Sequence, residues 1–115
     1  MSDLQRLGRQ AEDEAANFLF NAGYTIVTRR FNVKGGEIDL VALDGNVLVF
    51  VEVKGWKASG FTPEDGATPQ KMQRMTVAAH RYLAEIGEPG RAYRFDFIAI
   101  DSQGLRHYKD ALRDF

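Results

Sequence analysis

One segment of the chain is apolar on both of the faces that a β-strand would present. Val47 to Lys54 reads Val-Leu-Val-Phe-Val-Glu-Val-Lys, and its first charged residue is Glu52. Strand side chains alternate between two faces, so this run predicts a central strand that is covered on both sides. The fold must therefore place other layers against both faces of a sheet.

A turn signal fixes the partner of this strand. The segment from Glu37 to Leu43 is rich in Val, Ile and Leu, and Asp44-Gly45-Asn46 separates it from Val47, which predicts a β-hairpin. A two-residue turn at Asp44-Gly45 or at Gly45-Asn46 puts Asp39 on the face of Glu52, and the second makes the two direct neighbours. A three-residue loop without a bulge would turn Asp39 to the other face.

The remaining elements follow from periodicity and from capping residues. Ser2 and Gln5 form a capping-box pattern ahead of a helical stripe that stops at Gly23, and Thr68-Pro69 begins a second stripe that stops at Gly87. Between and after them we expect further strands and a functional loop or flap. The first stripe consists of Leu4, Leu7, Ala11, Ala15, Phe18 and Ala22, and the second of Met72, Met75, Ala79, Leu83 and Ile86. The expected strands are 24–33, 94–101 and a short edge strand from 105. The expected flap is 55–67.

The order of these elements is α-β-β-β-α-β, which predicts an α/β or α+β fold with a mixed central sheet flanked by helices. The chain has 115 residues, enough for a single domain over 1–115. It has no cysteine and no apolar run near the ~20 residues that span a bilayer, so we expect a cytoplasmic protein that does not enter the membrane. The formal net charge of -1 requires any DNA-binding charge to be gathered locally.

The end of the central strand breaks its apolar pattern. Glu52 and Lys54 share a face with Leu48 and Phe50, and an unpaired buried charge costs several kcal/mol, roughly, so both need partners or a ligand. Across the hairpin, Asp39 supplies a second carboxylate. Two carboxylates in a chain without thiols suit a hard cation, so we predict that Asp39 and Glu52 bind Mg²⁺ or Mn²⁺.

Other residues extend this predicted site. The backbone carbonyl of Val53 is a candidate third ligand, and Lys54 is a candidate to orient a nucleophile or to steady negative charge at a phosphate. Glu12 lies beside the apolar stripe of the first helix and is a further candidate acid, although an ordinary solvated glutamate explains it equally well. Glu37 would extend the acidic cluster.

These residues resemble a known pattern. Asp39, twelve intervening residues and Glu52-Val53-Lys54 resemble the D-Xn-E-X-K signature of the PD-(D/E)XK nuclease superfamily. A wider set resembles the YraN family, small bacterial proteins regarded as predicted endonucleases and similar to archaeal Holliday-junction resolvases. That set consists of Gly8, Glu12, Gly36 to Leu40, Phe50 to Lys54, Lys71 and Arg94 to Asp96.

The resemblance implies a restriction-endonuclease-like core, with Asp39 and Glu52 as metal ligands, Lys54 as the catalytic lysine and Glu12 as an auxiliary acid. The implied activity is metal-dependent hydrolysis of DNA, with branched or structured DNA as candidate substrates. Symmetric cutting of a junction would require a homodimer. A non-catalytic nucleic-acid- or protein-binding module that retains the fold is the alternative.

Candidate DNA contacts lie outside the carboxylates. Lys71, Gln70 and Arg74 could reach a phosphate backbone from the second helix, and Trp56 could stack on an unpaired base. Charged residues on an amphipathic helix more often form its wet face, and an aromatic side chain in a loop could equally anchor that loop.

Overall fold

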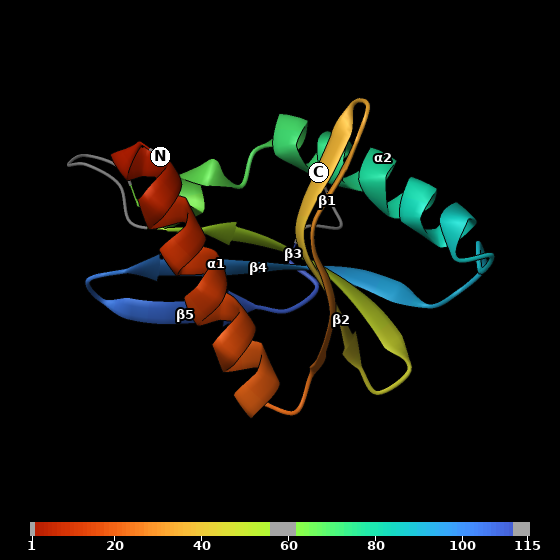
Figure 1. The fold of residues 1–115 in the computed structure, drawn as a ribbon, viewed down its shortest axis with the longest axis horizontal. Coiled ribbons are helices and arrows are strands. Elements are labelled where there is room, and N and C mark those ends of the chain that lie inside the picture. Colours follow the sequence, from red (N-terminus) through yellow and green to blue (C-terminus); the bar gives the residue numbers. More distant parts are fainter. Residues whose placement is uncertain (1, 56–61, 112–115) are drawn as a thin grey trace.

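The computed structural model describes residues 2–55 and 62–111. Five strands form one sheet in the order β1-β2-β3-β4-β5, and two helices and one short 3-10 turn complete the described part (Figure 1). The elements are α1 (Asp3–Asn21), β1 (Thr25–Val33), β2 (Gly36–Asp44), β3 (Val47–Lys54), η1 (Pro63–Gly66), α2 (Pro69–Glu85), β4 (Tyr93–Asp101) and β5 (Gly104–Tyr108).

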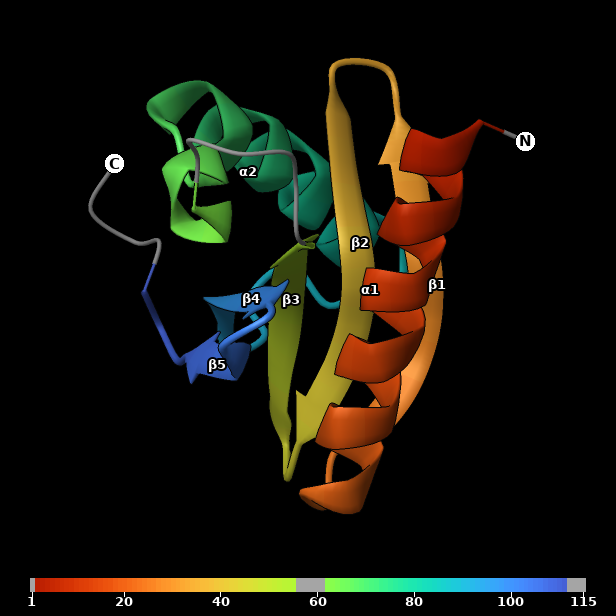
Figure 2. The same cartoon turned by 90° about the vertical axis from the view of Figure 1, so that its left-hand side faces the viewer.

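The central strand lies where its composition predicted. β3 runs antiparallel to β2 and parallel to β4, while the other neighbouring pairs are antiparallel. The two helices cover opposite faces of the sheet, as the views along two directions show (Figures 1 and 2). The mixed sheet with flanking helices confirms the expected fold class, and the expected edge strand is present as β5.

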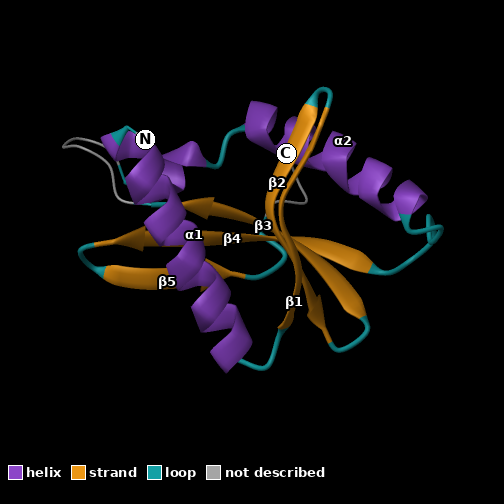
Figure 3. Ribbon diagram, viewed as in Figure 1, coloured by secondary structure: helices purple, strands orange, loops and turns teal. Residues whose placement is uncertain are grey.

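Each face of β3 packs into its own core. Leu48 and Phe50 join Met75 and Leu83 of α2 on one side, and Val49 and Val51 join the α1 residues on the other side. All four of these β3 side chains are at most 2% exposed. The strand thus occupies the middle of a three-layer arrangement of helix, sheet and helix (Figure 3).

The hairpin adopts the second of the two candidate two-residue turns. Asp44 pairs with Val47, so Gly45 and Asn46 form the turn, and Gly45 has the left-handed φ of 60° that favours glycine. The three-residue alternative is therefore wrong. The observed register keeps Asp39 on the face of Glu52.

Some expectations fail at the edges of elements. Leu7, Phe18 and Ile86 are 39%, 39% and 40% exposed, because the ends and flanks of the helices extend past the sheet. β2 begins at Gly36, one residue before the expected start of this strand, and η1 lies within the expected flap. The rest of that flap, 56–61, is outside the described residues. Neither described helix is long and apolar enough to cross a membrane.

A glycine lets α2 approach the sheet. A Cβ built on Gly36 would lie 2.6 Å from the carbonyl oxygen of Arg74 and 2.8 Å from the backbone nitrogen of Ala78. Real Cβ atoms do not come this close to backbone, so a side chain here would push α2 away from β2. Gly36 therefore sets the spacing between the strand that carries Asp39 and the helix that carries Lys71.

We expect Gly36→Ala to destabilise the fold by about 1–3 kcal/mol through overpacking. Urea unfolding followed by circular dichroism measures this loss. Gly90→Ala is the matched control, because a Cβ at Gly90 would meet no atom within 4 Å. Equal stability of the two variants would show that α2 is not held against Gly36.

Candidate metal centre

Asp39 and Glu52 meet at the end of the hairpin that is opposite its turn. Leu40 pairs with Val51, and the same register continued by one residue places Asp39 opposite Glu52. The backbone N–H of Val53 donates to Asp39 Oδ2 at 2.8 Å, which fixes the position of this carboxylate. Asp39 also marks a break in alternation, since Ile38 packs in the α2-side core and Leu40 in the α1-side core.

Glu52 is a buried acid with one unsatisfied oxygen. Glu52 is only 1% exposed, and its Oε1 lies 3.4 Å from Lys71 Nζ. The second oxygen, Oε2, is buried with no hydrogen-bond partner among the described residues. A buried polar atom without a partner costs about 1–3 kcal/mol, which a proton shared with the neighbouring carboxyl of Asp39, or a bound cation, would offset.

The pKa values of both acids are raised. Burial, and then the negative charge of Asp39, raise the pKa of Glu52 to about 8. Burial also raises the pKa of Asp39, against the hydrogen bond from Val53. The nearby lysines lower the pKa of Glu52 but do not offset these effects, so two neighbouring carboxylates hold a proton near neutral pH that a bound metal ion would displace.

The structure brings Lys71 to the carboxylates. Lys71 Nζ donates to Glu37 Oε1 at 3.0 Å and also lies near Glu52, and Arg74 Nε is 3.6 Å from the same oxygen of Glu37. Burial opposes the charge of Lys71, but Glu52 and Glu37 outweigh it, so its pKa is raised. Sequence patterns indicated Lys71, Arg74 and Glu37 as separate candidates. They did not predict the ion pairs between these residues, because the packing of α2 on β2 creates them.

Glu12 approaches the site from the other helix without joining the pair. Arg30 Nε donates to Glu12 Oε1 at 2.8 Å, and Arg30 has a φ of 56°, which is uncommon for a residue with a side chain. An open groove of about 460 Å³ runs along this part of α1, lined by Gln5, Gly8, Arg9, Glu12 and Arg30. The negative charge of Glu12 also acts on Asp39.

The remaining candidates are Gln70, Trp56 and Lys54. Gln70 is exposed on the first turn of α2, and Trp56 lies outside the described residues. Lys54 is half-buried at the end of β3, and its positive charge lowers the pKa of Glu52 against the effects that raise it. The site therefore consists of Asp39 and Glu52, with Lys54 and Lys71 as its nearest cations.

The donor set fits a hard divalent cation. In residues 2–55 and 62–111, no three His, Asp or Glu side chains come close enough together to hold a metal ion. Mg²⁺ commonly takes only one or two protein carboxylates and fills its other positions with water and phosphate oxygens. The unpartnered Oε2 of Glu52, the adjacent carboxylate of Asp39 and the absence of thiols from the sequence match that pattern.

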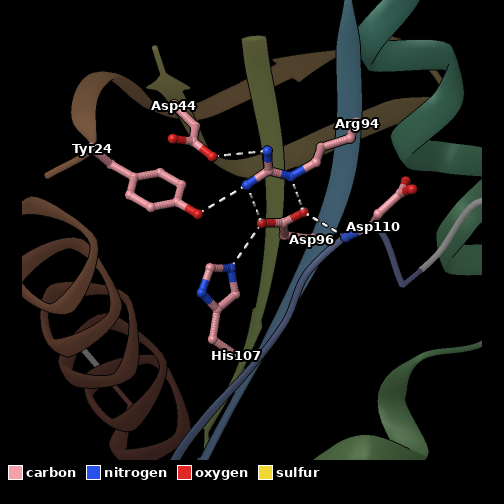
Figure 4. Close-up of polar contacts among 6 residues, drawn as sticks. All are labelled: Tyr24, Asp44, Arg94, Asp96, His107 and Asp110. Carbon is pink, nitrogen blue, oxygen red and sulfur yellow. Dashed lines mark hydrogen bonds and ion pairs between the residues drawn. The ribbon is translucent and has the colours of Figure 1, made fainter. Parts of the chain in front are cut away.

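A second buried acid shows what a structural carboxylate looks like in this fold. Asp96 is fully buried, and each of its oxygens has two partners (Figure 4). Arg94 Nε and the backbone N–H of Asp110 donate to Oδ1 at 3.0 and 2.9 Å, while His107 Nε2 and Arg94 Nη2 lie 2.8 and 3.3 Å from Oδ2. Burial opposes its charge, but these bonds outweigh it and lower the pKa of Asp96.

Arg94 connects this network to the rest of the fold. It also donates to Asp44 Oδ2 and to the hydroxyl of Tyr24, so the network joins β4, β5, the hairpin and the start of β1. Sequence reasoning noted Arg94 and Asp96 only as part of a motif. Their spacing of two residues on one strand face was the available signal that they could bond each other.

The two buried acids should respond oppositely to neutralisation. Because the folded pKa of Glu52 is raised, the fold loses stability as the pH rises from the ordinary glutamate range of about 4.3 through about 8. In metal-free buffer at pH 8.5, we expect Glu52→Gln to stabilise the chain by roughly 1–3 kcal/mol. The effect should vanish near pH 4, as urea unfolding at the two pH values would measure.

Asp96 has a lowered pKa, so its contribution to stability is present above the ordinary aspartate range and is lost in acid. We expect Asp96→Asn to destabilise the chain by roughly 3 kcal/mol at pH 8.5, because it breaks a buried ion pair. A loss of similar size at both positions would contradict the distinction between them.

Comparison with known proteins places the chain in a family. Residues 11–100 match the model of the family described as "Uncharacterised protein family UPF0102", the YraN family. The UPF0102 protein of Herminiimonas arsenicoxydans is 43% identical over 94% of this chain and 87% of its own length. The corresponding proteins of Dechloromonas aromatica and Symbiobacterium thermophilum are 43% and 41% identical, over 90% and 84% of this chain and 86% and 83% of theirs. This chain therefore belongs to the UPF0102 family.

Proposed function

We propose that this protein is a metal-dependent endonuclease that hydrolyses phosphodiester bonds of DNA. The observation that carries the proposal is the Asp39–Glu52 pair, in which a fully buried carboxylate oxygen has no partner among the described residues. Lys54 follows on the same strand face, so two acids and a lysine meet at one end of the hairpin. This is the constellation that metal-assisted phosphate chemistry needs.

Each residue has a separate role in this proposal. Asp39 and Glu52 hold Mg²⁺ or Mn²⁺, with the carbonyl of Val53 as a third candidate ligand. The ion supplies positive charge at the phosphate under attack and lowers the pKa of water. Lys54 orients the attacking water and offsets negative charge on the phosphate, because it shares the strand face of Glu52 and its positive charge acts on that carboxylate.

The surroundings favour a polyanionic substrate in spite of the net charge of -1. Arg9 and Arg30 line the groove beside α1, and Arg30 is ion-paired with Glu12. Within the described residues, Arg9 makes no hydrogen bond or ion pair, so its charge is free for a phosphate. We propose DNA, including branched DNA, as the substrate class, and a homodimer for symmetric cutting of a junction.

Ion binding and cleavage should separate the roles of the site residues. Isothermal titration calorimetry with Mn²⁺ should give saturable heat for the parent chain and none for Asp39→Asn, which removes a ligand charge. Lys54→Met should still bind the ion, yet lose at least about a hundredfold in cleavage, as expected when charge stabilisation of a transition state is lost. Cleavage is followed on linear, flapped and four-way DNA.

Glu85→Gln is the matched control, because Glu85 is an exposed acid at the far end of α2. It should bind Mn²⁺ and cleave DNA like the parent chain. Equal ion binding by Asp39→Asn and the parent would overturn the metal site. Ion binding without cleavage of any of the three DNAs would instead favour a non-catalytic nucleic-acid-binding module.

A further inference from the structure

The short turn η1 sits on the sheet between Lys54 and Arg106. Lys54 of β3 pairs with Ala99 of β4, and Ala99 pairs with Arg106 of β5, so the three side chains form one row across three strands. Ala99 belongs to the α2-side core, which places the row on the face of Glu52. The small side chain of Ala99 leaves room over the middle of this row for η1, which contacts β3 and β4.

Arg106 fastens η1 to the edge of the sheet. Its Nε and Nη2 donate to the two carboxylate oxygens of Glu64 at 2.7 and 3.1 Å, the paired geometry that gives the strongest arginine–carboxylate contacts. Asp101, the last residue of β4, accepts from Nη1 and Nη2 of the same guanidinium, each at 2.9 Å. The hydroxyl of Tyr108 donates to Glu64 Oε2 at 2.7 Å, so two side chains of β5, Arg106 and Tyr108, bind Glu64 of η1.

The other end of η1 lies against the Lys54 side chain. A Cβ built on Gly66 would stand 2.8 Å from Lys54 Cε, 2.9 Å from Cγ and 3.0 Å from Cδ. The lysine stem thus runs directly over the Cα of Gly66, in space that any other residue would fill. Within the described part of the chain, the Lys54 ammonium has no hydrogen bond or ion pair of its own. Packing against Gly66 is what limits its direction.

Both acids of η1 make hydrogen bonds that hold the turn in place. Hydrogen bonds from Arg106 and Tyr108 lower the pKa of Glu64 to about 2. Asp65 Oδ2 accepts the backbone N–H of Thr62 at 3.1 Å, which caps the turn. Both carboxylates are therefore occupied in holding η1 together and in holding it to β5.

We propose that Arg106, Glu64 and Gly66 are positioning residues for Lys54: Arg106 anchors η1 through Glu64, and Gly66 directs the lysine stem so that its ammonium stays beside the Asp39–Glu52 pair. The effect on catalysis rests on the proposed nuclease function, whereas the placement of Lys54 does not. The three residues touch neither the ion nor the substrate. They act through the direction of one side chain.

Gly66→Ala and Arg106→Met test the proposal from the two ends of η1. Gly66→Ala should displace only the flexible lysine stem, so the melting temperature and Mn²⁺ affinity should stay near those of the parent. The turnover number on DNA should fall about 10- to 100-fold, as expected for a catalytic group misplaced by about 1 Å, while KM changes little. Arg106→Met should give the same split between kcat and KM, through release of η1.

A direct readout of Lys54 makes the result independent of activity. In carbon-13 NMR spectra, the Lys54 Cε resonance is assigned by its loss in Lys54→Arg. It should shift in Gly66→Ala and in Arg106→Met, and it should stay in place in the control Gly90→Ala, where a Cβ meets open space.

The outcomes separate the two proposals. An unmoved Lys54 resonance in both variants would overturn the positioning role, whatever the activity. If the resonance shifts in the two variants but the parent protein cleaves no DNA, the positioning role is supported and the nuclease function is rejected.

Discussion

The site depends on the register of one hairpin. The turn at Gly45–Asn46 pairs Asp44 with Val47, and the same register carries Asp39 to Glu52 at the far end. A slip of one residue would turn Asp39 to the other face of the sheet and separate the two acids. Because β3 packs into a core on each face, such a slip would also exchange the side chains that fill the two cores, so the packing that stabilises the fold also fixes the site.

The two buried acids of the sheet differ in how completely neighbouring groups satisfy their oxygens. Each oxygen of Asp96 accepts hydrogen bonds from two donors, and the lowered pKa of Asp96 keeps it charged within that network. Glu52 is equally inaccessible, but one oxygen has no partner among the described residues and its pKa is raised to about 8. The fold satisfies one charge completely and leaves the other incomplete, which is what an ion-binding site requires.

Local patterns were sufficient for the fold and for part of the site. Alternation, capping residues and the Asp44-Gly45-Asn46 signal predicted both helices, the hairpin and the face shared by Glu52 and Lys54, because each of these depends on neighbours in the sequence. They could not predict that Lys71 reaches Glu52, that Gly36 admits α2, or that Arg106 holds η1, since these contacts join distant segments. The sequence is compatible with three turns, two of two residues and one of three, and the pairing of Asp44 with Val47 selects Gly45–Asn46.

The proposed site requires the Asp39–Glu52 pair to hold a proton that a divalent cation replaces. Calorimetric titration with Mn²⁺ at pH 7, repeated in buffers of different ionisation enthalpy, counts the protons released for each ion bound. With the pKa of Glu52 at about 8 in the metal-free chain, we expect release of about one proton per ion, and none in Glu52→Gln. Binding of Mn²⁺ without proton release, or with the same release in Glu52→Gln, would contradict this requirement.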